Sequence, residues 1–483
     1  MPRTGGNPLM ASEARDQWRH AIIIGGGITG LTVAHLLQRA HHTLRVTLLE
    51  SDDRLGGKIR TEVVAGVRVD VGPDAIVAGP SAMRLCESLG LRDRLVSPAA
   101  STALIWVRGR LRPIPQGLMQ GIPTRIGPVV RSGVLSPLGM LRAGFDLVLP
   151  RTPVGDDMAV GTYVGRRLGR QVVDRLVDPL LGGIYAGSAD ELGIRSAAPD
   201  LYGIARRHRS LIAGLRALRR ASAQSLGPRP GLVTLDGGLG VVVERLTESL
   251  SAADVRQRTA ALRIEPRGQH WRVHTAAESL DADVVIIATP AFAAADLLRT
   301  VSPEATETLY EIPYASVATV TLAYPKGVGA IDSGISGFLV PRSEGRTITA
   351  CTVLSNKWLH LAPPDVALIR CSIGRRHQSE ALHLDDDALV RRVHHDLRDA
   401  LRITAEPITA RVVRWPQALP QYVAGHQQRI WDIERALPEG LVLAGAAYEG
   451  VGLATCIAHA ERVATEVVGN LGVRAAEAIG QTA

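Results

Sequence analysis

The feature that most constrains this chain is a glycine-rich turn between a short apolar strand and a helix. Residues 21–24 are apolar, Gly25-Gly26-Gly27-Ile28-Thr29-Gly30 follows at once, and residues 31–37 are apolar at helical spacing. A second apolar strand over 45–49 ends at Glu50 and Ser51, and Glu50 comes twenty residues after Gly30. This order predicts a βαβ unit with G-x-G-x-x-G at its strand-to-helix turn.

Such a turn is suited to binding a dinucleotide. Its glycines permit a tight turn, bring backbone amides close to a pyrophosphate and, at Gly30, let the helix pack closely on the strand. The helix N-terminus favours the phosphate charge, and Glu50 would accept hydrogen bonds from a ribose. A glycine-rich turn alone matches many connections, so the prediction depends on strand, helix and acid lying in register.

A second glycine pair, Gly56-Gly57, is followed by Lys58 and can present more amides and basic side chains to the same phosphates. The interpretation as an ordinary basic turn stays open for this segment taken alone. Near the other end of the chain, an apolar strand over 441–445 leads through Val451, Gly452 and Leu453 into a helix predicted to end near residue 468. Its first amides would stabilise negative charge on a bound cofactor.

Length and composition favour a multidomain globular enzyme. The chain has 483 residues, of which 46% are hydrophobic and 21% charged, which suggests two or three packed units. Residues 283–289 predict another buried strand, and Val255 with residues 271–274 a small hairpin. The predicted division is a leader over 1–19, a discontinuous nucleotide domain over 20–100, 225–305 and 411–470, a helical arginine-rich insertion over 101–224, a mixed-sheet substrate domain over 306–410, and a tail over 471–483.

The basic charge is almost entirely arginine, because only three residues are lysines. Residues 104–220 hold eighteen Arg, no Lys and eight Asp or Glu, a formal excess of +10. The skew toward arginine fits a GC-rich coding sequence, or recognition of carboxylates and phosphates. Nucleic acid is a poor partner, because aromatics are only 4% and no nucleic-acid-binding motif is present.

The cysteines point to a reducing compartment. Cys86, Cys351, Cys371 and Cys456 are far apart and form neither a C-x-x-C pair nor a metal-ligand cluster, so we expect a cytoplasmic protein without a metal site. The leader lacks the apolar core of a secretory signal, and the longest uncharged stretch is interrupted by glycines.

Several dispersed segments resemble one protein family. They are residues 115–124, 178–187, 336–341, 414–426 and 445–452, whose sequences include DPLLGGIYAG, SGFLVP, RWPQALPQYVAGH and GAAYEGVG. With the two glycine motifs, they are similar to the protoporphyrinogen and coproporphyrinogen oxidases, a branch of the amine-oxidase-like flavoproteins. The likeness runs from about residue 20 to 470 and is greatest to the soluble Gram-positive type, which oxidises coproporphyrinogen III.

The resemblance implies an α/β fold with a Rossmann-like FAD-binding domain, and FAD rather than NAD. The residues expected to line FAD are Gly25, Gly26, Gly27, Ile28, Thr29, Gly30, Glu50, Ser51, Gly57, Lys58, Gly72, Pro73, Asp74, Ala75, Val255, Trp415, Val451, Gly452 and Leu453. Tyr185 and Arg112 are the substrate candidates, with packing as the alternative role for Tyr185. Relatives often carry a basic residue just after Gly-Pro-Asp, and residues 77–81 have none, so a propionate anchor there is in doubt.

In family terms, FAD takes hydride from the porphyrinogen and O2 reoxidises it to give H2O2. No side-chain base is required, and no catalytic residue is named. Protoporphyrinogen IX is the alternative substrate, and a flavin amine oxidase, a polyene desaturase or a binding protein without turnover are more distant alternatives. Residues 126–150 form either a core face or a peripheral membrane foot, and similarity to the soluble branch favours the core. Contact with haem-pathway enzymes and the oligomeric state stay open.

Overall fold

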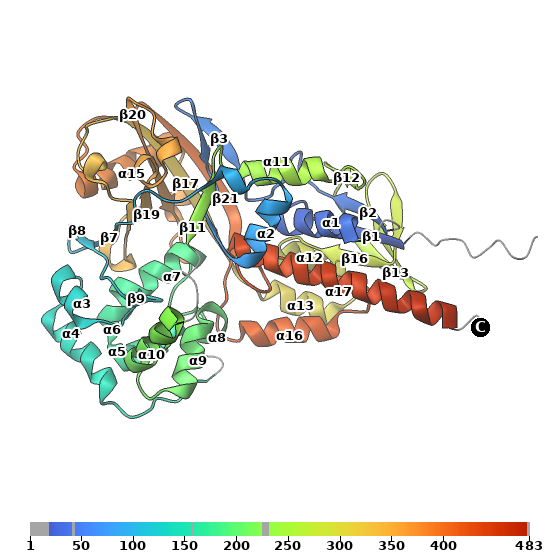
Figure 1. Ribbon diagram of the computed structural model, residues 1–483, viewed down its shortest axis with the longest axis horizontal. Helices are drawn as coiled ribbons and strands as arrows, with labels where there is room; N and C mark the ends of the chain where they lie inside the picture. Colours follow the sequence, from blue (N-terminus) through green and yellow to red (C-terminus); the bar gives the residue numbers. More distant parts are fainter. Residues whose placement is uncertain (1–18, 41–43, 156–157, 225–230, 481–483) are drawn as a thin grey trace, which may run out of the picture.

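The computed structural model describes residues 19–40, 44–155, 158–224 and 231–480. The predicted βαβ unit forms the middle of a five-stranded parallel sheet (Figure 1). β1 (Arg19–Ile24) pairs with β2 (Leu44–Leu49) and with β16 (Val284–Ile287). β12 (Asp254–Arg256) and β22 (Leu441–Leu443) complete the two edges. Segments far apart in the sequence therefore build one Rossmann-like sheet, and this fold prediction is confirmed.

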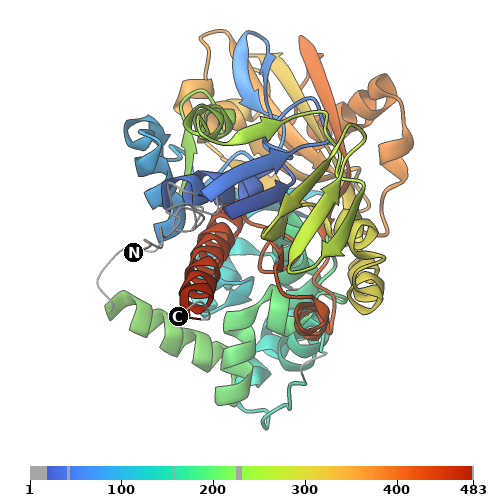
Figure 2. The ribbon, with the colours of Figure 1, turned by 90° about the vertical axis from the view of Figure 1, so that its right-hand side faces the viewer.

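The two faces of this sheet belong to different cores, because side chains alternate along each strand. Ile23 and Leu48 lie in a core with α1 (Ile28–Ala40), α2 (Pro80–Ser88), α11 (Gly240–Ser249) and α17 (Leu453–Gly480). Ile22 and Ile24 lie in a second core with α12 (Ala291–Leu298), α13 (Pro303–Tyr310) and α16 (His426–Ala436). Figure 2 shows α17 in red beside the blue strands. Burial on both faces is the usual state of a parallel sheet.

The second large element is a seven-stranded mixed sheet. Its strand order is β21 (Thr409–Pro420), β17 (Tyr314–Pro325), β20 (Val366–Ile373), β19 (Ile348–Val353), β18 (Gly337–Leu339), β7 (Ala103–Val107) and β8 (Arg110–Pro113). α15 (Asp386–Leu401) packs on one face of this sheet. The opposite face is turned toward the nucleotide domain, since Thr319 of β17 donates a hydrogen bond to the Val71 carbonyl at 2.7 Å.

The pairing of the outer strands differs from the expected domain boundaries. β7 and β8 lie within 101–224, the expected helical insertion, yet β7 pairs in parallel with β18. β21 lies largely within 411–470, the expected nucleotide segment, yet it pairs with β17. β7 and β18 are more than two hundred residues apart in the sequence. β17 and β21 are separated by the strands and helices that lie between them along the chain. A local sequence pattern therefore cannot predict either pairing.

The remainder of 101–224 is mostly helical, as expected, and packs around its own core at the lower left of Figure 1. Its main helices are α3 (Ile126–Ser132), α4 (Pro137–Gly144), α5 (Val160–Leu168), α7 (Asp178–Tyr185), α9 (Pro199–Arg207) and α10 (Leu211–Gln224). We call this part the helical unit. Across the described residues, the search for a helix long and apolar enough to cross a membrane found none.

Three smaller expectations differ from the structure or lie outside it. Val255 is not part of a hairpin, because β12 pairs in parallel with β2, while residues 270–274 pair with 263–267 and 279–282. α17 continues to Gly480 instead of ending near residue 468, through an alanine-rich stretch of high helix propensity. Residues 1–18 of the leader and 481–483 of the tail lie outside the described residues.

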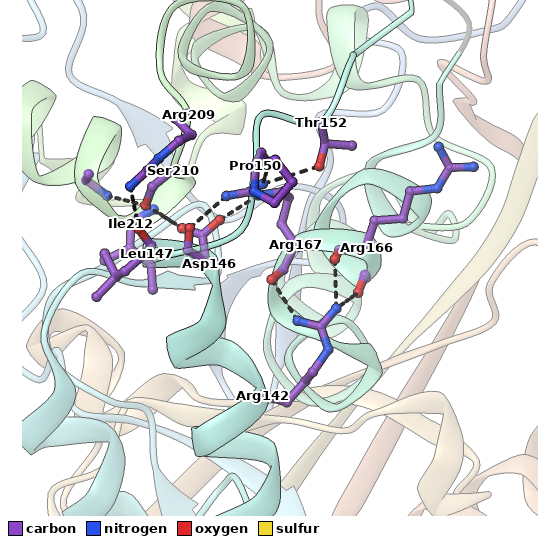
Figure 3. Close-up of polar contacts among 12 residues, drawn as sticks. Arg142, Asp146, Leu147, Pro150, Thr152, Arg166, Arg167, Arg209, Ser210 and Ile212 are labelled. Carbon is purple, nitrogen blue, oxygen red and sulfur yellow. Dashed lines mark hydrogen bonds and ion pairs between the residues drawn. The ribbon is translucent and has the colours of Figure 1, made fainter.

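A buried ion pair fixes the helical unit (Figure 3). The carboxylate of Asp146 accepts from Arg167 Nε at 2.7 Å, and both side chains are 0% exposed. Asp146 also accepts from the Ser210 hydroxyl at 2.6 Å and the Ile212 amide at 2.9 Å, while Arg167 donates to the Pro150 carbonyl at 2.5 Å. The pair thus joins α5, the start of α10 and the segment after α4.

Removing one partner would leave the other charge buried without compensation. We expect Arg167→Met to lower the free energy of unfolding by about 3–5 kcal/mol. The matched control is Arg245→Met, because Arg245 pairs with Glu248 on the exposed face of α11 and should change stability by less than about 1 kcal/mol. Chemical denaturation of both variants measures the difference, and equal losses would contradict the role given to the buried pair.

Candidate cofactor site and active site

The glycine turn brings α1 closer to β1 than any side chain would allow. A Cβ placed on Gly30 would lie 2.0 Å from the carbonyl oxygen of Gly25, and Gly25 itself has φ +108°. A Cβ on Gly27 would meet nothing within 4 Å. The turn is therefore packed tightly on its inner side and open above Gly27, where a pyrophosphate is expected.

Glu50 is held at the end of β2 by the same turn. Its carboxylate accepts the amide of Gly26 at 2.7 Å and the amide of Asp52 at 2.9 Å, and the Ser51 hydroxyl donates to it at 3.2 Å. The side chain is buried. These bonds fix the orientation of the Glu50 carboxylate at the end of β2, with Ser51 beside it.

The second glycine pair lies directly against the first. The Gly56 amide donates to the Gly26 carbonyl at 2.8 Å, and a Cβ on Gly57 would lie 3.2 Å from the Cα of Gly27. A Cβ on Gly72 would lie 2.1 Å from the carbonyl oxygen of Lys58. Three segments distant in sequence thus stack backbone on backbone, and we call them together the glycine cradle (residues 25–30, 56–58 and 72).

Lys58 carries a positive charge at this cradle. Its side chain reaches solvent, yet the surrounding protein lowers the pKa of its ammonium, opposed by an interaction with Cys456 in α17. Among the described residues, no carboxylate pairs with the Lys58 ammonium or accepts a hydrogen bond from it. An exposed cation beside the N-terminus of α1 attracts an anion, so the residues present fit the pyrophosphate of a dinucleotide.

The start of α17 reaches the same place. Gly452 accepts the amides of Thr455 and Cys456 within its own first turn, and Cys456 interacts with both Thr29 and Lys58. The predicted residues Val451 and Leu453 flank Gly452 and are half-buried. Val255 pairs with Leu48, one residue before the end of β2, which places it at the sheet edge near Glu50.

The segment 72–75 joins the cradle to the seven-stranded sheet. Trp415 donates to the Val71 carbonyl at 3.2 Å, and its ring lies 3.5 Å from a Cβ on Gly72. Asp74, after Pro73 and before Ala75, pairs with Lys357 at 3.0 Å and Arg370 at 2.8 Å. Burial alone would raise the pKa of Asp74, but these two cations hold it well below its usual range.

The sequence did not indicate the ion pairs of Asp74, which lie beside the cradle. Arg370 also donates to the carbonyls of Asp70 and Gly72, each at 2.9 Å. Burial raises the pKa of the neighbouring Asp70 to about 6. Lys357 and Arg370 lie within 306–410, the expected substrate domain, and carry no motif, so only the folded chain brings them to Asp74.

Tyr185 lies near the loop that leads into α17. Its ring is 5.5 Å from the ring of Tyr422, whose hydroxyl donates to the Ala446 carbonyl at 2.5 Å. Tyr185 itself is buried within the core of the helical unit. This arrangement favours the packing alternative for its side chain, while the exposed neighbours Gly183 and Ile184 are accessible.

Arg112 is not brought to the cradle. It lies on β8, one edge of the seven-stranded sheet, whereas Trp415 lies on β21 at the other edge. Six strand spacings separate the two edges, about 29 Å. The guanidinium of Arg112 instead lies under Gly133, where a Cβ would come 2.3 Å from Nη1. The structure therefore does not support Arg112 as a contact to a substrate at the cofactor.

Comparison with protein-family models matches residues 28–468 to the flavin containing amine oxidoreductases. The chain belongs to this family. A flavin is therefore its cofactor, and the glycine cradle with Glu50 and Lys58 fits the dinucleotide part of FAD. Among solved structures, a putrescine oxidase shares the fold with a TM-score of 0.69 at 15% identity, over 94% of this chain and 99% of that one.

Relatives within the family are more similar. A coproporphyrinogen III oxidase from Bacillus subtilis (strain 168) is 36% identical over 454 residues, 92% of this chain and 96% of that protein. One from Propionibacterium freudenreichii subsp. freudenreichii is 34% identical over 483 residues, 93% and 90% of the two chains. A structure from Exiguobacterium sp. 255-15, provisionally assigned as a protoporphyrinogen oxidase, has a TM-score of 0.83 at 32% identity, covering 93% and 98%.

Loss of the Lys58 charge should weaken flavin binding. We expect Lys58→Met to bind FAD roughly 10- to 100-fold more weakly, the usual range for a charge-assisted hydrogen bond. Lys326→Met is the matched control, because Lys326 is exposed beyond β17 and should bind normally. Quenching of flavin fluorescence during titration of the apoproteins gives both dissociation constants, and equal values would refute the role of Lys58.

Proposed function

We propose that this chain is an FAD-dependent oxidase that converts coproporphyrinogen III to coproporphyrin III in haem biosynthesis. The observation that carries the proposal is the 36% identity to a coproporphyrinogen III oxidase across nearly the whole of both chains. When bound, FAD accepts three hydride equivalents in succession from the macrocycle and is reoxidised by O2, with H2O2 released each time. The protein binds and orients the macrocycle.

A strip of the seven-stranded sheet supports this proposal, because the neighbouring units cover it only in part, with Leu339 at its edge packed against the core of the helical unit. Leu339, Ala350 and Ser372 occupy one row across β18, β19 and β20. The row continues to Thr319 on β17, which is buried against the nucleotide domain. In the other direction it continues to Ile105 on β7, which is buried in the core of the helical unit. The residues between stay half-buried. We call Leu339, Ala350, Thr352 and Ser372 the uncovered strip.

The chemistry of the uncovered strip suits a flat, largely apolar macrocycle. Its side chains are small or aliphatic and none of them titrates, so the strip provides a neutral surface without a general base. Pyrrole N–H protons would then leave to water, as no positioned base is present among these four residues. The strip lies on the same sheet face as Trp415 and Thr319, which contact the cradle segment at Val71, so a ring on the strip is adjacent to the flavin site.

The proposal is tested by a parallel assay of FAD-loaded protein with coproporphyrinogen III and protoporphyrinogen IX. We expect a higher kcat/KM for coproporphyrinogen III, measured by porphyrin fluorescence and oxygen uptake above a blank without enzyme. Preference for protoporphyrinogen IX would identify the protein as a protoporphyrinogen oxidase instead. A chloroplast protoporphyrinogen oxidase of Nicotiana tabacum is 29% identical to this chain. Turnover of neither substrate by the flavin-loaded protein would refute both.

We also propose that this protein is cytoplasmic and contacts the surface of an anionic membrane. The four cysteines are free and buried, as in a reducing compartment. In the helical unit, Leu138, Leu141, Phe145 and Val148 are 77%, 62%, 48% and 68% exposed. Their spacing places them on one side of α4 and its continuation. The excess of arginine in the same unit supplies the complementary charge.

The sequence favoured burial of residues 126–150 in a core. These four side chains are instead exposed. We expect the wild-type protein to co-sediment with vesicles containing phosphatidylglycerol and the double variant Leu138→Asp, Leu141→Asp to bind at least about tenfold more weakly. Leu359→Asp is the control, because Leu359 is equally exposed on the seven-stranded unit. Equal binding of all three proteins, or binding of none, would refute membrane contact through α4.

A further inference from the structure

Helix α7 lies against the middle of the seven-stranded sheet and meets it at Leu339, beside Gly183. It packs on β18 and β19, and the contact is made by glycine: a Cβ on Gly183 would lie 3.6 Å from Leu339 Cδ2. Leu339 is part of the uncovered strip, so Gly183 borders the proposed substrate surface. A glycine surface buries little apolar area, so apolar packing holds this part of α7 only weakly against the sheet.

Arg342 supplies the missing attachment. It follows β18 by three residues, and its Nη2 donates to the carbonyl of Gly187, just beyond the C-terminus of α7, at 2.9 Å. Its Nε lies 3.5 Å from the carboxylate of Asp178, the first residue of α7. One guanidinium therefore contacts both ends of the same helix.

The groups around Arg342 keep it in that position. Its Nη1 donates to the Arg376 carbonyl at 3.2 Å and to Gln378 Oε1 at 3.3 Å. Asp178 uses its other carboxylate oxygen to accept the amide of Ala189 at 2.8 Å. The guanidinium thus bridges the turn after β20 and the helix, and most of its donors are used within the protein.

Contacts from the same turn strengthen the attachment. The Arg376 amide donates to the Ala186 carbonyl at 2.8 Å, and its guanidinium donates to Glu191 at 2.7 Å. Ala186 has a left-handed backbone, φ 49°, which ends α7 and directs the Gly187 carbonyl toward Arg342. The helix is preceded by a single turn of π-helix over Val173–Val177, a feature common beside functional sites.

We propose that Arg342 is a positioning residue that clamps α7 over the uncovered strip and so sets the distance between Gly183 and the bound macrocycle. The proposal rests on the proposed porphyrinogen oxidase function for its effect on catalysis. The clamp itself is a property of the folded chain and is measurable without any substrate. Arg342 acts through α7, since its Nη1 and Nη2 donate to protein oxygens while its Nε faces Asp178 as an ion pair at 3.5 Å without a hydrogen bond.

The test compares Arg342→Gln and Arg342→Lys with Arg346→Gln in flavin-loaded enzyme. Arg346 lies four residues away and is similarly buried, but it pairs with Asp396 and Asp399 of α15 on the opposite face of the sheet. Peptide-resolved hydrogen exchange over 178–190 reports the position of α7, and KM and kcat for coproporphyrinogen III report its consequence. Flavin content and the unfolding midpoint identify a variant that fails to fold.

We expect Arg342→Gln to speed exchange in 178–190 by about tenfold or more, the usual effect of losing hydrogen bonds from a charged group. KM should rise by a similar factor at unchanged flavin content, and Arg342→Lys should restore part of both. Arg346→Gln should leave exchange in 178–190 and KM unchanged. Asp178→Asn tests the other half of the ion pair if the arginine variants do not fold.

The outcomes separate the clamp from the proposed function. Exchange over 178–190 that is equal in Arg342→Gln and Arg346→Gln overturns the clamp, whatever the substrate. Faster exchange with unchanged KM and kcat overturns its role in positioning. If the wild-type enzyme oxidises neither porphyrinogen, the proposed function fails, while the exchange data still decide whether Arg342 holds α7.

Discussion

The close approach of backbone to backbone at the glycine cradle is the constraint on which the rest of the structure depends. Helix α1 crosses β1 where a Cβ on Gly30 would lie 2.0 Å from Gly25 O, and Gly72 is equally close to Lys58 O. Any side chain at either position would push apart segments that start the parallel sheet and the connection to the second sheet. The cradle also leaves space above Gly27 and an exposed lysine beside it, so the same packing that closes the core opens an anion site.

Several arginines of the helical unit donate hydrogen bonds to backbone carbonyls. Arg142 donates to the carbonyls of Arg166 and Arg167 at the end of α5, and Arg175 and Arg216 donate to those of Val134 and Thr124. The last carbonyls of a helix lack partners within it, and a guanidinium with five donors can supply several at once. Arg112, a substrate candidate in the sequence, lies at the sheet edge beside Gly133, away from the glycine cradle.

The sequence predicted those elements that short-range patterns of apolar residues and turn residues determine. The βαβ unit and the strand before α17 follow from apolar runs next to glycines, the strand at 284–287 follows from an apolar run that ends before Pro290, and the cradle residues lie together. The prediction of a hairpin at Val255 failed because β12 pairs with β2, and no periodicity distinguishes a parallel edge strand from a hairpin arm. The pairs of Asp74 with Lys357 and Arg370 span nearly three hundred residues, so their signal exists only in the fold. Arg342 likewise acquires its role only when β18 and α7 meet.

The width of the seven-stranded sheet explains how one chain holds a tightly packed cofactor cradle and an open site for a large ring. Four strand spacings separate β17, which the nucleotide domain covers, from β7, whose Ile105 and Val107 lie in the core of the helical unit. That distance is about 19 Å. Two units attached at these two strands cannot meet over β18, β19 and β20 with side chains of ordinary length, so the strip between them stays half-buried. Helix α7 borders it with Gly183 on the side facing Leu339, and Arg342 contacts both ends of that helix. A narrower sheet would bring the units together and close the strip, whereas bulkier residues on α7 would fill it.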